Sequence, residues 1–211
     1  MAKNPERTYG QYGFPFVSLL FIICYLPMKN VIVMTVEKKH KTSVSNACWG
    51  ALIGFVCLGI VGAIPLQENA VLLGSKNSKV TLETQSIIHQ AAAGIFFMCS
   101  IWHTQTILGV MVDTESPILN ANIKRNYISY LFKQGSMYMM FLPAVISFVL
   151  HPTSSIAKML KLNKLFNAGD MGGISQYIAV LAVMIFFTSY SIDFYHCHQI
   201  KQKNIRLKKL D

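Results

Sequence analysis

Two histidines in the longest apolar run of the chain are the first candidates for chemistry. His89 and His103 lie fourteen residues apart in the stretch from Ile87 to Val112. A helix rises about 1.5 Å per residue, so the two side chains would lie about 21 Å apart and could not share one metal ion or one proton. The spacing predicts two separate contacts, in which each histidine bonds to a neighbouring helix or a headgroup; a proton-sensing or lipid-headgroup role is the alternative.

The sequence also predicts which way this helix faces. At about 100° per residue, one narrow face collects both histidines and three residues between them. Polar atoms are costly inside a bilayer, so we expect this face to look into a helix bundle rather than at lipid. The members of the face are His89, Ala93, Phe96, Ser100 and His103.

A carboxylate precedes His89 and could meet it. Gln67 and Glu68 follow the preceding apolar run, so Glu68 and His89 would lie at the same membrane face if the two runs form antiparallel neighbours. Such a pair suits acid–base work and equally suits a structural ion pair. The chain has no nucleophile elbow, Walker loop or HExxH motif. The sequence therefore predicts no catalytic residue and no enzyme.

Cysteine and histidine near the C-terminal end do not predict a metal site. His196 and His198 flank Cys197, but residues two apart point to different faces of a helix and converge poorly on one ion. The chain has five cysteines, four in apolar runs and Cys197 at the end of another. We expect small buried side chains there, with no disulfide, metal or cofactor.

Composition defines the class of protein. Of 211 residues, 53% are hydrophobic and 13% are charged, whereas soluble domains carry about 25% charged residues. The chain is therefore expected to be an all-α, polytopic transmembrane helix bundle. Its net charge of +10 predicts cytoplasm-facing loops and membrane lipids with anionic headgroups as partners. Nucleic acid is not expected, because no basic patch is interleaved with aromatic residues.

Five apolar runs are long enough to span a bilayer, within one membrane domain over residues 1–211. Pro27 is expected to kink the first run. Small residues in the second, including a GxxxG pair, predict close helix packing. The expected spans are 14–36, 46–66, 87–112, 127–150 and 174–195, followed by a basic tail at 196–211; the packing glycines are Gly50, Gly54, Gly59 and Gly62.

Positive charges predict the orientation. Lysines and arginines after the first and third runs and in the tail slightly outnumber those on the opposite side, which favours a cytoplasmic tail. Residues 151–173 space three lysines among apolar residues and predict an amphipathic helix on the membrane surface. Asp193, near the end of the last run, is expected at the interface, facing a lysine. The polar N-terminal residues 1–13 show no cleavable signal pattern.

Two stretches together resemble the DRAM/FRAG group, which comprises damage-regulated autophagy modulators and the more distant GPI-lipid-remodelling membrane proteins. The first stretch runs from Ser45 to Leu108 and carries a glycine-rich span end, Gly59 to Gly62, then Gln67 and the span-opening His89. The second runs from Gln176-Tyr177 through TSYSIDFYHCHQI and includes Tyr190, Asp193 and Phe194.

The resemblance implies a non-enzymatic protein that modulates autophagy or lysosomal membrane function. The alternative is lipid handling, either GPI-anchor lipid remodelling or control of phosphoinositide and phospholipid distribution. Lysosomal or related endomembranes are the expected location, with ER–Golgi or plasma membrane as alternatives. Two departures stand out: the group usually has six spans, the first without a counterpart here, and Gln176 replaces a frequent glutamate. A small transporter or channel is a weaker reading.

Overall fold

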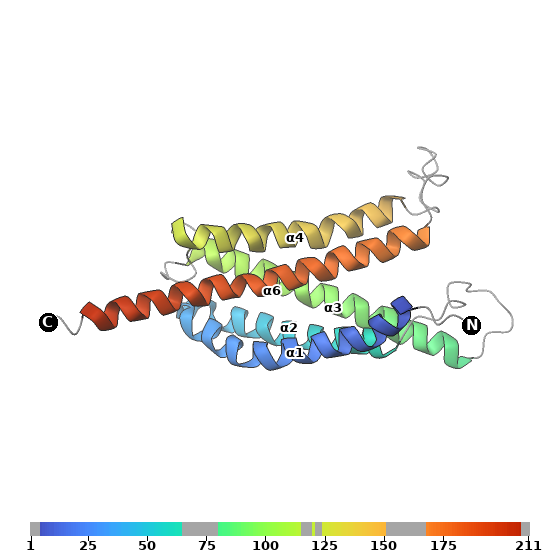
Figure 1. Ribbon diagram of the computed structural model, residues 1–211. Helices are drawn as coiled ribbons and strands as arrows, with labels where there is room; N and C mark the ends of the chain where they lie inside the picture. Colours follow the sequence, from blue (N-terminus) through green and yellow to red (C-terminus); the bar gives the residue numbers. More distant parts are fainter. Residues whose placement is uncertain (1–4, 65–79, 115–119, 121–123, 151–167, 208–211) are drawn as a thin grey trace. The chain divides into compact units, whose positions relative to one another are not determined.

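The computed structural model describes residues 5–64, 80–114, 120, 124–150 and 168–207. Every regular element in these ranges is helical, which confirms the all-α prediction. Figure 1 shows the helices. Their bounds are α1 Pro5–Thr35, η1 Lys38–His40 (a short 3-10 turn), α2 Lys41–Ala63, α3 Val80–Asp113, α4 Lys124–Leu150 and α6 Ala168–Leu207.

Four helical segments are long and apolar enough to cross a membrane, so the polytopic class predicted from composition is supported. The segments are Gln11–Thr35, Lys38–Ala63, Ile87–Asp113 and Tyr177–His196. Side chains of α4, the remaining expected span, are described only over 126–142. A count of five spans therefore stays a prediction. The expected surface helix at 151–173 lies mostly outside the described residues.

The helices extend beyond the expected spans; α1, for example, begins at Pro5 rather than at residue 14. α3 begins at Val80, where the sequence suggests a polar loop, and α6 continues to Leu207, well into the basic tail. The residues added at the start of α3 (80–86) and at the end of α6 (196–207) contain no glycine or proline, the residues that most strongly oppose helix. An apolar run ends where the chain leaves the membrane, but residues beyond that point can still favour a helix. The lengths of apolar runs therefore underestimate the lengths of the helices.

The chain packs as two compact units, Met1–Thr106 and Ile107–Asp211, whose boundary falls within α3. In the first unit, α1 and α2 form an antiparallel hairpin (Figure 1). α1 starts with proline at its first helical position, a favoured place, and remains helical through Pro15 and Pro27. It bows along its length rather than ending at either proline.

Glycines of α2 allow both neighbouring helices to approach closely. A Cβ added at Gly50 would lie 2.8 Å from the ring of Trp102 in α3, and one at Gly54 would lie 3.2 Å from Cys99 Cβ. On the other side, a Cβ at Gly59 would lie 3.0 Å from Ser18 Oγ of α1. The two glycine pairs thus serve different interfaces.

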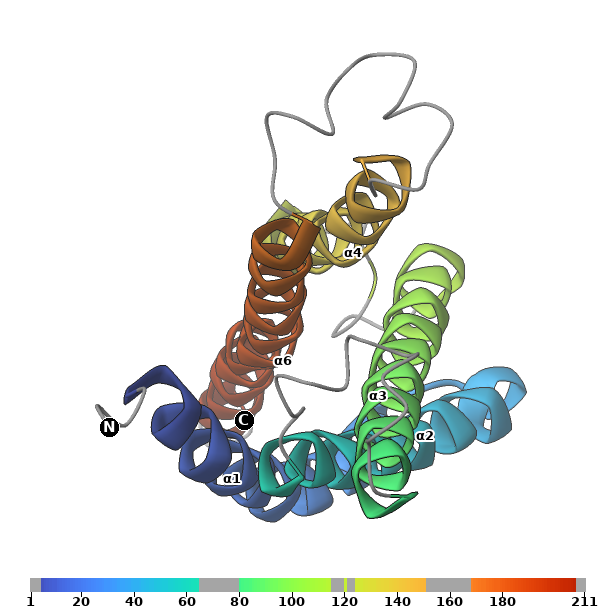
Figure 2. The same cartoon turned by 90° about the vertical axis from the view of Figure 1, so that its right-hand side faces the viewer.

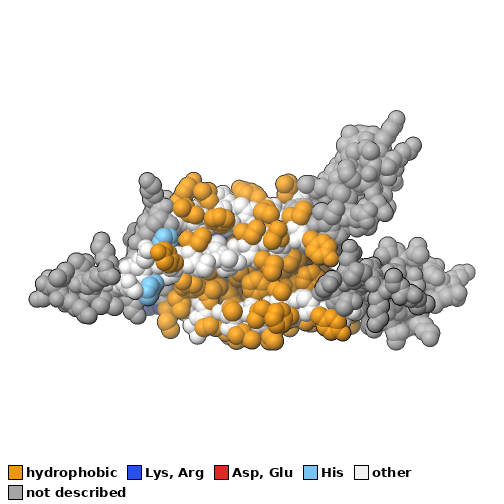
Figure 3. Space-filling model, viewed as in Figure 1, with side chains coloured by type: hydrophobic (Ala, Val, Ile, Leu, Met, Phe, Trp, Pro, Cys, Tyr) orange, Lys and Arg blue, Asp and Glu red, His pale blue; other side chains and the backbone are white. Residues whose placement is uncertain are grey.

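In the second unit, α4 and α6 lie side by side and antiparallel, as Figures 1 and 2 show. Their apolar core includes Phe186 and Tyr190 of α6, both almost fully buried. Outward-facing side chains along the described helices are mainly apolar, and Figure 3 shows them covering the visible face. A surface of this kind suits contact with hydrocarbon rather than water.

Replacing Gly62 with valine should destabilise the α1–α2 hairpin. A Cβ at this position would overlap Pro15 Cδ and lie 2.7 Å from Phe14 Cβ, atoms held by α1 itself. Overpacking typically costs about 1–3 kcal/mol, so Gly62→Val should lower the melting temperature of the purified protein in detergent. Gly135→Ala is the matched control, because its Cβ would have no atom within 4 Å. An unchanged melting temperature for Gly62→Val would contradict this packing.

Candidate functional site

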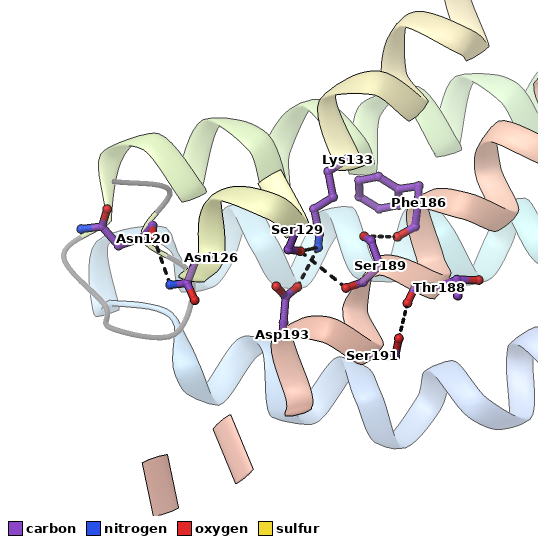
Figure 4. Close-up of polar contacts among 9 residues, drawn as sticks. All are labelled: Asn120, Asn126, Ser129, Lys133, Phe186, Thr188, Ser189, Ser191 and Asp193. Atoms are coloured by element: carbon purple, nitrogen blue, oxygen red, sulfur yellow. Dashed lines mark hydrogen bonds and ion pairs between the residues drawn. The ribbon is translucent and has the colours of Figure 1, made fainter. Parts of the chain in front are cut away.

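Two opposite charges are buried between α4 and α6 (Figure 4). Lys133 Nζ lies 2.7 Å from Asp193 Oδ2, and the two side chains are 0% and 4% exposed. The antiparallel helices bring the start of α4 and the last third of α6 to the same level. Transfer of an unpaired charge into a low-dielectric interior is very costly, so each of these charges requires the other.

Two further groups contact the ammonium of Lys133. Lys133 Nζ also donates to Ser129 Oγ at 2.6 Å, one helical turn earlier, and lies 4.5 Å from the centre of the Tyr190 ring. Ser129 in turn donates to the carbonyl oxygen of Ser189 at 3.5 Å, the long limit for such a bond. The ammonium thus faces two oxygens and the face of an aromatic ring, a favourable cation–π partner.

These residues belong to a polar stripe on α4. Asn126, Ser129, Lys133 and Ser136 follow one another at steps of three, four and three residues, and all are at most 1% exposed. The steps match the helical repeat, so the stripe occupies one face. We call the stripe together with Ser189 and Asp193 the α4–α6 polar cluster.

One oxygen of the cluster is incompletely satisfied. Asp193 Oδ1 is buried, and no group among the described residues donates a hydrogen bond to it. A carboxylate accepts hydrogen bonds on both oxygens. Asp193 Oδ1 can therefore accept a hydrogen bond from a water molecule, or it can bind a proton. The chemistry of the cluster is that of a charge pair with one open acceptor, suited to anchoring two helices and to holding a proton.

A second polar contact joins α1 to α3 in the first unit. The Tyr25 hydroxyl and His103 Nε2 are hydrogen-bonded at 3.2 Å, with their rings edge to face at 5.7 Å. Tyr25 and His103 are 1% and 0% exposed, and Tyr25 also contacts the buried thiol of Cys48. The contact places one residue from each of three helices together.

The other histidine connects α2 to α3. His89 Nδ1 donates to the carbonyl oxygen of Ile64, the residue that caps α2, at 2.6 Å. Helix ends leave carbonyl groups without intrahelical partners, so His89 satisfies a group that would otherwise be costly in a membrane. Both histidines thus bond to neighbouring helices, in agreement with the prediction of two separate contacts rather than a shared site.

The predicted inward face of α3 is only partly buried. Phe96, Ser100 and His103 are buried, whereas His89 and Ala93 are half-buried. Ser100 donates its hydroxyl to the carbonyl oxygen of Phe96 in its own helix. The face therefore points inward along its second half.

Several predicted residues do not enter either contact. Gln67 and Glu68 lie outside the described residues, so the expected Glu68–His89 pair stays a prediction. Gln176 lies in α6, within a stretch whose side chains are not described. In the described part of the chain, no three His, Cys, Asp or Glu residues gather closely enough to hold a metal ion.

Two participants were missing from the predicted site, although Asp193 was expected to face a lysine. Neither Lys133 nor Tyr25 is among the predicted site residues. The signal for Lys133 was available: a lone base and a lone acid in neighbouring apolar runs need each other. Tyr25 gave no comparable signal, since tyrosine is common in membrane helices.

Removing one charge of the ion pair should cost more than removing both. Lys133→Met leaves Asp193 unpaired in the interior, and breaking a buried pair in this way costs about 3–5 kcal/mol. Lys133→Met combined with Asp193→Leu leaves no charge and should recover most of the lost stability. Thermal unfolding of the four proteins (wild type, both single variants and the double variant) measures the coupling. Additive losses in the double variant would contradict the pairing.

Comparison with known proteins adds no assignment: no family model, no curated protein and no solved structure matches this chain.

Proposed function

We propose that this chain is a non-enzymatic integral membrane protein of lysosomal or related endomembranes and that it modulates autophagy. The proposal rests on the resemblance of residues 45–108 and 176–200 to the DRAM/FRAG group. The polytopic helical architecture, with four apolar helices, is consistent with it.

One observation carries the proposal: residues that bear the resemblance make contacts between helices in the structure. Gly59 and Gly62 of the glycine-rich span end pack directly on α1. His89, which opens the next span in the group, bonds to the last turn of α2 through Ile64. The motif residues therefore join α2 to α1 and to α3, which gives these residue types a structural role.

The polar contacts favour a structural role over catalysis. The Lys133 ammonium, the Tyr25 hydroxyl and the His89 imidazole each bond to groups of the protein itself. A reaction centre requires a nucleophile or base within reach of a bound substrate. Contacts consumed in joining helices instead suit a membrane protein that acts through partners or through the bilayer.

The location of the full-length protein tests the proposal first. A tagged chain expressed in its own cells should coincide with lysosomal or autolysosomal markers. Removal of the gene should lower autophagic flux, measured as cargo turnover with and without a lysosomal inhibitor, and re-expression should restore it. Signal confined to the ER–Golgi or the plasma membrane, with unchanged flux, would overturn this function.

A specific contact favours lipid handling as the second candidate. Lys29 Nζ lies 3.7 Å from the centre of the Trp49 ring, on the half of the α1–α2 hairpin that leads to the connecting turn. That turn carries Lys38, Lys39 and Lys41, all exposed. Lysine and tryptophan favour the headgroup level of a bilayer, and clustered lysines attract anionic headgroups.

Neutralising the turn tests this candidate. Replacing Lys38, Lys39 and Lys41 together with glutamine should weaken binding to anionic lipid, because each lysine near the surface contributes about 1 kcal/mol. The measurement is co-purification of phosphatidylserine and phosphoinositides with the protein, quantified by mass spectrometry. The matched control replaces the same lysines with arginine. Equal lipid recovery from the glutamine and arginine variants would reject headgroup binding at this turn.

A further inference from the structure

The hydrogen bond between His89 and Ile64 determines where a proton can bind to the histidine ring. His89 Nδ1 lies 2.6 Å from the Ile64 carbonyl oxygen. Because a carbonyl oxygen only accepts hydrogen bonds, Nδ1 carries a hydrogen in the neutral ring and in the charged ring alike. The neutral ring therefore keeps its lone pair on Nε2, and Nε2 is the atom that takes up a proton.

The end of α2 favours a positive charge close to it. α2 ends at Ala63, Ile64 caps it, and its last turn contains no basic residue. The aligned peptide groups of a helix leave about half a negative charge at its C-terminal end, and a cation near that end is stabilising. Since α2 supplies no such cation from its own last turn, the ring of His89 in α3 is the group that can supply it.

Protonation leaves the donor of this bond in place and adds charge to it. A hydrogen bond from an ionised donor is shorter and about twice as strong as one between neutral groups. The other histidine of the helix differs in its surroundings, because His103 is 0% exposed and a charge placed there would be costly. His89 is therefore the histidine of α3 whose described contact improves when the ring is charged.

His89 lies where protons can reach it. The ring is half-buried and sits close to the start of the apolar segment Ile87–Asp113. Among the side chains that the structure describes, no charged or titratable group of α1, α2 or α3 bonds to the ring. The charged residues nearest to the contact in the sequence have side chains outside that description; they are Glu68, Lys76, Lys79 and Glu83.

We propose that His89 is a proton-binding site through which acid strengthens the contact between α2 and α3. A proton that binds to Nε2 charges the ring, and the carbonyl end of α2 attracts this charge. The orientation predicted from the positive charges puts this end of α2 opposite the cytoplasm, so the site responds to the pH of a lumen or of the cell exterior. The acid response is independent of the function proposed above, because it requires only the contact with Ile64.

Amide hydrogen exchange of the full-length protein in lipid nanodiscs tests the acid response. The two conditions are about pH 7.5 and about pH 5, on either side of the usual range of histidine. Protection of the last turn of α2, corrected for the intrinsic exchange rate, should rise roughly two- to fivefold in acid, the range expected for a charge at a helix end. Equal protection of the wild-type protein at both pH values would overturn the proposal.

Two histidine variants assign the response to a residue. His89→Gln keeps an amide that can donate to the Ile64 carbonyl oxygen but cannot be charged, so the rise in protection should disappear. His40→Gln is the matched control, because His40 is also half-buried and lies at the opposite end of α2. This control should keep the rise. A rise that persists in His89→Gln, or that vanishes in His40→Gln, would refute the assignment to His89.

A third variant and a spectroscopic measurement distinguish the helix end from an ion pair. Glu68→Gln should keep the rise in protection, since the attracting group is the end of α2; loss of the rise would assign it to an ion pair with Glu68 and overturn the proposal. NMR of nitrogen-labelled histidine should show the neutral ring of His89 with its hydrogen on Nδ1. A neutral ring with its hydrogen on Nε2 would contradict the proposed site.

Discussion

In a hydrocarbon layer, each polar group needs a partner supplied by protein, because water is not there to supply one. This constraint decides which surfaces of the helices meet. Lys133 meets Asp193 across α4 and α6, and Tyr25 meets His103 across α1 and α3. Apolar side chains contribute little direction to such an arrangement, since lipid tails are as apolar as leucine. The polar pairs therefore specify which helix faces pack, and the small residues determine how closely.

The two glycine pairs of α2 contact different helices. Gly50 and Gly54 lie against α3, whereas Gly59 and Gly62 lie against α1. A single helix can contact two neighbours in this way only if its small residues fall on different faces. The hydrogen bond from Ser18 of α1 to the Phe55 carbonyl oxygen of α2 adds direction to the tight interface. Packing and polar pairing thus act on the same helix pairs.

Much of the helical architecture could be predicted from the sequence, because hydrophobic runs respond to one dominant cost. The ranges 14–36, 46–66 and 87–112 lie largely within α1, α2 and α3. Helix ends were less predictable, since α6 continues to Leu207 for reasons of propensity rather than hydropathy. The partners of individual polar residues were harder to predict than the helix ends. Asp193 could be expected to face some lysine, but the choice of Lys133 depends on which helix lies beside α6, which no local pattern fixes.

The same constraint accounts for the two histidines of α3. His103 is buried against Tyr25 of α1, and His89 donates to the Ile64 carbonyl oxygen at the end of α2. A helix whose polar residues bond to two different neighbours is fixed in rotation as well as in depth, because turning or sliding it would leave one of these groups unpaired. On this argument, searches for polar residues in apolar runs should ask which neighbouring helix can supply a partner for each of them.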